Sequence, residues 1–205
     1  RDLHLSLRRQ RQMCIRDSET YGKPGNYVAR QLSRWTKQYL ASETETIPEM
    51  DNLIEWLANN IPDDDETSIV HGDYRLDNMI YKNHEVIGVL DWELSTLGHP
   101  IADFSYHCLT WRTLPAMSDL KLIKELGIPS EVEYRDMYSE YTGKDLSKNW
   151  EFYMVFNMFK IAAICQGILG RVRDGTASSK HAEERGMQVF PISKAAWNIV
   201  ETNFK

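Results

Sequence analysis

The chain has 205 residues, of which 42% are hydrophobic and 26% are charged, and its formal net charge at pH 7 is −6. This length and composition predict one globular domain with a sizeable core. Beyond the first 17 residues the sequence has no basic stripe, which argues against a nucleic-acid partner. No apolar run approaches the roughly 20 residues of a membrane span, so we expect no membrane partner either.

Residues 1–20 form a basic leader whose character differs from the rest of the chain. It lacks the apolar core of a signal peptide, and we interpret it as a linker, a cloning or gene-boundary remnant, or a targeting segment. The three cysteines, Cys14, Cys108 and Cys165, are odd in number and widely spaced. Neither a disulfide framework nor a cysteine-built zinc site is expected, and a reducing compartment, the cytoplasm, is favoured.

Two amphipathic helices are predicted before residue 62. In the first, over 26–39, apolar residues recur at steps of four, three and four, and the second covers 49–60 and ends before Pro62. Ile69 and Val70 then predict a very short strand. A hairpin follows, with strands at 79–81 and 86–90 around a polar turn.

The remainder of the chain is predicted to be helical. Helices are expected, in order, at 102–111, 119–126, 131–142, 150–173 and 180–204. Ser130 and Glu133 form the N-terminal capping pattern of the third. The fourth is apolar on most sides, which predicts a buried central helix about 36 Å long. The last should bend near Pro191.

A cluster of polar residues, HGDYRLDN, lies between the first short strand and the predicted hairpin. His71-x-Asp73 followed by Asn78 matches the catalytic loop of protein kinases, in which the aspartate takes the substrate hydroxyl's proton and the asparagine binds Mg²⁺. Asp91 ends a hairpin strand thirteen residues later, where such a lobe presents its second metal ligand. Turn hydrogen bonds would explain each residue singly, but the joint pattern favours a phosphotransfer site.

This pattern carries a family resemblance. The segments VHGDYRLDNMI and VLDWELSTLGHPIADFSY resemble the aminoglycoside phosphotransferase and choline kinase superfamily. More narrowly, YGKPGNYVARQLSRWTKQYLASET and NWEFYMVFNMFKIAAICQG resemble the phosphotransferase-like domain of multidomain acyl-CoA dehydrogenases and its free-standing bacterial relatives. The resemblance covers 21–205. It implies an α+β, mainly helical fold: the C-terminal lobe of a protein-kinase-like fold, with a small β-hairpin at the active site.

Position by position, the resemblance implies Asp73 as the catalytic base and Asn78 and Asp91 as Mg²⁺ ligands. His71 would order the loop. Asp103 would tie together the loop that follows the hairpin, or cap the next helix.

Of five further positions, all but Glu93 have two interpretations. Arg75 either steadies the loop by pairing with a neighbouring carboxylate or lies on the surface. Ile80 and Leu90 stand where such lobes offer an apolar floor to adenine, although hairpin packing also explains them. Trp92 and Glu93 follow the metal aspartate and would touch the acceptor, although packing explains Trp92 equally well.

The implied activity is that of a small-molecule kinase: ATP- and Mg²⁺-dependent transfer of the γ-phosphate to an alcohol group. The dehydrogenase resemblance favours a hydroxyacyl-CoA or a 4-hydroxy acid as acceptor over an aminoglycoside. The alternative is a catalytically silent, kinase-like binding or assembly module. An organelle replaces the cytoplasm as the expected compartment if the chain comes from a eukaryotic multidomain protein.

A complete kinase fold also has an N-terminal β lobe with a phosphate-covering loop and a strand lysine. Only 70 residues precede the motif, and after Tyr21 they predict helices. We therefore expect the N-terminal lobe to be missing from this chain, and that lobe or a fused dehydrogenase domain to be its partner. Alone, the chain is expected to bind ATP poorly and to transfer phosphate weakly or not at all.

Overall fold

The computed structural model describes residues 22–64, 66–114, 117 and 119–204. The basic leader expected at 1–20 lies outside these residues, as does Cys14. The helices are α3 (Tyr27–Ser42), α4 (Pro48–Asn59), α5 (Pro100–Cys108), α6 (Thr110–Thr113), α7 (Leu120–Glu125), α8 (Glu131–Thr142), α9 (Trp150–Arg173), α10 (Ala182–Gly186) and α11 (Val189–Asn203). The strands are β1 (Ser68–Val70), β2 (Met79–Lys82), β3 (Glu85–Val89) and β4 (Thr96–Gly98), and two 3₁₀ helices are η1 (Leu76–Asn78) and η2 (Trp92–Leu94).

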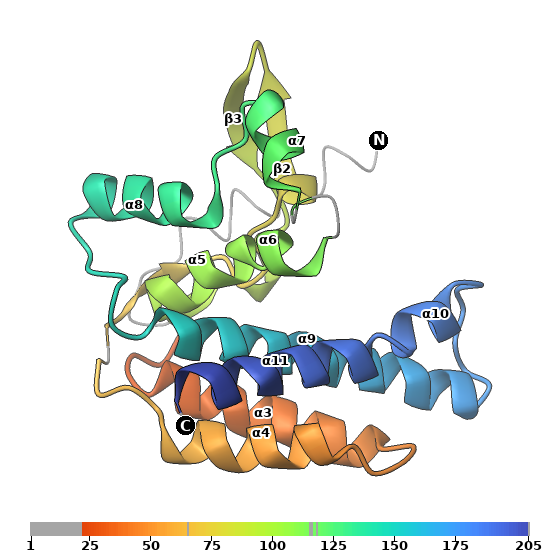
Figure 1. Ribbon diagram of the computed structural model, residues 1–205. Helices are drawn as coiled ribbons and strands as arrows, with labels where there is room; N and C mark the ends of the chain where they lie inside the picture. The colour runs from red at the N-terminus through yellow and green to blue at the C-terminus, as the bar shows by residue number, and fades with distance from the viewer. Residues whose placement is uncertain (1–21, 65, 115–116, 118, 205) are drawn as a thin grey trace.

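Helix α9 is the centre of the molecule. The helices α3, α4, α5, α10 and α11 all pack against it. Figure 1 shows α3, α4, α9 and α11 together in one helical layer, with α5 and α6 between that layer and the β2–β3 hairpin. Tyr153, Met154 and Phe159 of α9 are fully buried. Because apolar side chains cover most sides of α9, neighbours on every side are needed to remove them from water.

The same helix corrects one expectation from the sequence. Among the described residues, α9 is long and apolar enough to cross a membrane by length and composition, although no run of that kind was expected. In its most apolar window, 72% of the residues are buried inside the fold. Its apolar surface is therefore covered by the neighbouring helices, as the prediction of a central core helix requires.

The described β structure consists of two short antiparallel pairs. β2 and β3 form the predicted hairpin, and its turn residues Asn83 and His84 both have positive φ, which suits a tight hairpin turn. β1 pairs with β4, a strand that the sequence pattern did not predict. Gly98 permits this pairing, because a Cβ there would lie 2.6 Å from Cγ2 of Val70. The pair brings the chain after the hairpin back beside β1.

The predicted C-terminal helix is two helices, α10 and α11, which separate at Met187 and Gln188. Pro191 lies in the first turn of α11, so it does not bend the helix as expected. A proline is tolerated there, because the backbone N–H groups of a helix's first turn have no hydrogen-bond partner within the helix. The break therefore precedes the proline.

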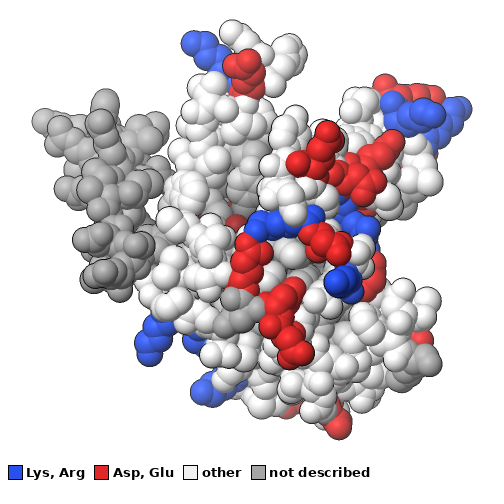
Figure 2. Space-filling view, turned by 90° about the vertical axis from the view of Figure 1, so that its left-hand side faces the viewer, with Lys and Arg blue, Asp and Glu red and all other residues white. Residues whose placement is uncertain are grey.

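Charged side chains on the described surface are mixed in sign. On the face seen in Figure 2, acidic side chains gather near the middle, with basic ones beside them. A cluster of ion pairs joins α6, α8 and α9: the Arg112 guanidinium binds Glu131 (Nη2–Oε1, 2.6 Å) and Glu151 (Nη1–Oε2, 2.6 Å). Burial alone would raise the pKa of Glu131, but the hydrogen bonds from Arg112 hold that pKa below its ordinary value.

We expect Arg112→Met to lower the free energy of unfolding by about 3 kcal/mol, because two half-buried carboxylates would remain without their cation. Urea denaturation followed by circular dichroism measures the loss. Lys121→Met is the matched control, since its ion pair with Glu125 is exposed and should contribute less than about 0.5 kcal/mol. Equal losses in the two variants would contradict a structural role for the Arg112 cluster.

Candidate functional site

The Asp103 carboxylate fixes the backbone of the HGD loop. Asp103 lies in the first turn of α5, and its Oδ2 and Oδ1 accept hydrogen bonds from the backbone N–H groups of His71 (2.7 Å) and Gly72 (2.9 Å). Hydrogen bonds from amides to a carboxylate are among the stronger ones in proteins. The loop that leaves β1 is thus held to α5, 31 and 32 residues later in the chain.

The His71 ring connects this loop to the end of the hairpin. Its Nδ1 accepts from the backbone N–H of Asp73 (3.3 Å), and its Nε2 lies 2.7 Å from the Leu90 carbonyl oxygen. Since Nδ1 accepts, Nε2 carries the proton and donates to that carbonyl. Trp92 covers the ring at a centroid distance of 4.8 Å, and its Nε1 donates to the Val89 carbonyl (2.9 Å). These contacts give Trp92 a packing role in the loop.

Two donors orient the Asp73 carboxylate. The Tyr106 hydroxyl donates to Oδ1 (2.9 Å), and Nδ2 of Asn78 donates to Oδ2 (3.0 Å) and to the Asp73 carbonyl (2.9 Å). Burial, and then the charge of Asp73, raise the pKa of Tyr106. The Tyr106 hydroxyl therefore keeps its proton and remains a donor, which fixes the direction in which the Asp73 carboxylate points.

Asn78 and Asp91 offer two oxygen ligands to a metal ion. The backbone carbonyl of Asn78 accepts from the Leu90 N–H (2.7 Å), so Asp91 follows directly on a residue bonded to Asn78. Asp91 has φ 62°, a left-handed conformation that turns the chain into η2. Among the described residues, neither the Asn78 amide oxygen nor the Asp91 carboxylate has a hydrogen bond or ion pair.

This donor set fits Mg²⁺ bound together with a nucleotide. Mg²⁺ prefers hard oxygen ligands and usually takes only one or two from protein, with phosphate and water completing its octahedron. The described chain contains no group of three or more His, Cys, Asp or Glu side chains arranged to hold a metal by themselves. Asn78 and Asp91 would thus hold the ion only in part.

The remaining expected site residues lie on the open surface around the loop. Arg75 forms an exposed ion pair with Asp77 of the same loop, so both interpretations of Arg75 apply and the pair contributes little to stability. Ile80 on β2 is 39% exposed and Leu90 is half-buried, which leaves apolar surface at the hairpin. Glu93 is exposed and has no hydrogen bond or ion pair with any described residue.

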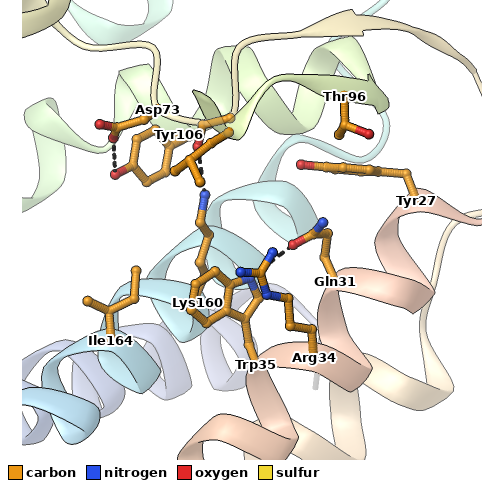
Figure 3. Close-up of a pocket in the computed structure, with 11 residues that line it drawn as sticks. Tyr27, Gln31, Arg34, Trp35, Asp73, Thr96, Tyr106, Lys160 and Ile164 are labelled. Carbon is orange, nitrogen blue, oxygen red and sulfur yellow. Dashed lines mark hydrogen bonds between the residues drawn. The ribbon is translucent and has the colours of Figure 1, made fainter. Parts of the chain in front are cut away.

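A cavity of about 260 Å³ lies beside Asp73. Figure 3 shows its walls, which come from α3, the HGD loop, α5 and α9. The lining residues are Tyr27, Gln31, Arg34, Trp35, Gly72, Asp73, Leu94, Thr96, Tyr106, Lys160 and Ile164. Asp73 is one of these residues, so an acceptor molecule in this cavity would lie against the HGD loop.

Two residues of this site were not anticipated from the sequence. Tyr106 stands three residues after Asp103, on the same face of α5, and this spacing was a usable signal. Lys160 is the one charged residue between Phe152 and Gly170 of α9. Its Nζ donates to the Gly72 carbonyl (3.0 Å) and lies 4.3 Å from the Tyr106 ring centroid.

We expect Asp103→Asn to speed hydrogen exchange at the His71 and Gly72 amides by about tenfold, because an amide offers one acceptor oxygen and no charge. Hydrogen exchange read by mass spectrometry checks this. Asp119→Asn is the matched control, since Asp119 accepts from the amides of Lys121 and Leu122 at the start of α7 and should change exchange only there. Unchanged exchange at His71 and Gly72 would rule out the anchoring role.

Comparisons with known proteins show the family of this chain. A family model described as a phosphotransferase enzyme family matches residues 1–138. Acyl-CoA dehydrogenase family member 10 of Mus musculus is 43% identical over 188 residues, which cover 88% of this chain and 18% of the mouse protein. Acyl-CoA dehydrogenase family member 11 of Homo sapiens is 38% identical over 193 residues, which cover 91% of this chain and 25% of the human protein.

A solved structure extends the comparison to the fold. A protein from Ralstonia eutropha JMP134, provisionally described as an aminoglycoside phosphotransferase, has a TM-score of 0.84 and 50% identity, over 89% of this chain and 57% of that one. The chain spans a quarter or less of these two curated relatives. The resemblance inferred from the HGD motif and the mainly helical α+β, kinase-like fold are both confirmed. This chain belongs to the phosphotransferase enzyme family.

Proposed function

We propose that this phosphotransferase uses ATP and Mg²⁺ to transfer the γ-phosphate to an alcohol group of a small molecule in the cytoplasm. The observation that carries the proposal is the setting of Asp73. Its carboxylate is oriented by Tyr106 and Asn78, and Asp73 is among the residues that line a cavity. Asn78, which bonds to Asp73, and Asp91, at the end of the hairpin, each have a side-chain oxygen without a partner among the described residues.

Each of these groups matches a requirement of phosphoryl transfer. The acceptor hydroxyl must lose its proton as its oxygen bonds to the γ-phosphorus and the bond to the ADP oxygen breaks. Asp73 would take that proton, and two hydrogen bonds to its carboxylate support this role. Mg²⁺ bound with the nucleotide would neutralise phosphate charge, and Asn78 and Asp91 would hold it.

The favoured acceptors are hydroxyacyl-CoA molecules or 4-hydroxy acids. Support comes from the curated relatives, which are named as acyl-CoA dehydrogenase family members and are several times longer than the matched segment. A dehydrogenase domain fused to a phosphotransferase would act on the acyl group that the phosphotransferase modifies. An aminoglycoside, which the description of the Ralstonia eutropha structure suggests, is the less favoured acceptor.

Asp73→Asn should lower kcat about 10³-fold, because the amide cannot accept the hydroxyl proton. The assay uses the protein encoded by the complete gene, with ATP, Mg²⁺ and 4-hydroxypentanoate or its CoA ester, and ³¹P NMR identifies the phosphate ester. Asp77→Asn is the matched control, four residues away and exposed, and should keep its activity. Full activity of the Asp73 variant would remove it as the base.

Asp91→Asn should weaken binding of Mn²⁺, a paramagnetic probe for Mg²⁺, by about tenfold in the presence of ATP, because one anionic ligand is lost. Asparagine tolerates the positive φ of this position, so the loop should keep its shape. Free Mn²⁺ measured by electron paramagnetic resonance gives the affinity. Glu93→Gln removes a neighbouring exposed carboxylate as the control, and equal weakening in both variants would argue against Asp91 as a ligand.

A further inference from the structure

The cavity beside Asp73 carries more positive than negative charge. Among its lining residues, Arg34 and Lys160 are basic, and Asp73 is the one acid. Figure 3 shows Lys160 extending from α9 to the HGD loop, while Arg34 from α3 lies beside the Trp35 ring. The guanidinium carbon of Arg34 is 5.2 Å from that ring centroid. Such a lining favours an acceptor with a negative or strongly electron-rich group over a polycation.

Lys160 is the more enclosed of the two cations. Its ammonium donates to the Gly72 carbonyl (3.0 Å) and lies over the rings of Tyr106 (4.3 Å) and Trp35 (5.9 Å). No carboxylate of a described residue forms an ion pair with it. Burial lowers the pKa of Lys160, while the charges of Asp103 and Asp73 act in the opposite direction. An ammonium has three N–H donors, and the single hydrogen bond to Gly72 leaves two for a ligand.

The position of this ammonium relative to Asp73 limits the spacing between the hydroxyl and the electron-rich group of the acceptor. Lys160 contacts the carbonyl of the residue that immediately precedes Asp73. It also lies on the ring of Tyr106, whose hydroxyl binds Asp73. The two charged groups are thus separated by about the length of one aromatic side chain. A molecule that reaches both must carry its hydroxyl and its electron-rich group only a few bonds apart.

We propose that Lys160 is a specificity-determining residue that binds the acyl oxygen of the acceptor, the carboxylate of a hydroxy acid or the carbonyl of its thioester, and so places the hydroxyl at Asp73. This inference rests on the proposed phosphotransfer to an alcohol. Arg34, an exposed residue that also lines the cavity, supplies a second cation for the rest of an acidic acceptor. Because Lys160 also donates a hydrogen bond to Gly72, the residue that would bind the ligand also contacts the catalytic loop.

The test compares acceptors that differ only in the acyl oxygen: 4-hydroxypentanoate, its CoA ester and pentane-1,4-diol. The wild-type protein should prefer the acid or the ester over the diol by about tenfold or more in kcat/KM, the effect of one charge-assisted hydrogen bond. Lys160→Met should reduce this preference to within about twofold. Separate assays of the acid and the ester show whether Lys160 recognises a carboxylate or a thioester carbonyl.

Two further variants separate recognition from loop support. Lys160→Gln keeps a donor for the Gly72 carbonyl but removes the charge, and it should lose the preference for the acid. Lys37→Met changes an exposed lysine on α3 and should keep that preference. If the Lys160 variants lower kcat/KM for all three acceptors equally, Lys160 only supports the loop and the inference is overturned.

A binding experiment makes the inference independent of turnover. Calorimetric titration of the 205-residue chain with 4-hydroxypentanoate and with pentane-1,4-diol needs neither ATP nor Mg²⁺. Weaker binding of the acid to folded Lys160→Gln supports the inference, even if no alcohol is phosphorylated and the proposed function fails. Phosphorylation of the diol as efficiently as the acid and ester, with equal binding, would overturn the inference and leave the proposed function standing.

Discussion

The site depends on one carboxylate that binds two consecutive backbone amides. Asp103 accepts hydrogen bonds from the N–H groups of His71 and Gly72. The backbone immediately before Asp73 is therefore fixed. One turn later on α5, Tyr106 binds the Asp73 side chain. A single helix, α5, therefore positions both the backbone and the carboxylate of the candidate base. Because α5 packs on α9, the core of the molecule holds this geometry.

The hairpin is joined to this frame by a second set of contacts. The His71 ring bonds both the Asp73 amide and the Leu90 carbonyl, while Asn78 bonds Asp73 through its side chain and Leu90 through its backbone. Both routes end immediately before Asp91. These hydrogen bonds thus fix the position of the candidate base relative to the candidate metal ligands.

The sequence predicted the parts of the site that are local in the chain. His71, Asp73 and Asn78 are brought together by one loop, so their spacing alone indicates their proximity. Lys160 could not be placed in the same way, because α9 is apolar on most sides and its sequence does not tell which face meets the loop. The strand β4 was missed for a similar reason: three residues form no readable alternation, and they become a strand only by pairing with β1.

This division separates the chemistry of the site from its selectivity. The groups proposed for proton transfer and metal binding lie on the loop and hairpin, whereas the cavity wall that would meet an acceptor comes mainly from α3, α5 and α9. A substitution of Arg34 on the cavity face of α3 can change the charge of that wall without touching the HGD loop, whereas Lys160 of α9 also bonds to the Gly72 carbonyl. A family can therefore keep one HGD loop and redirect it to chemically different alcohols, since fold and acceptor are set by different residues.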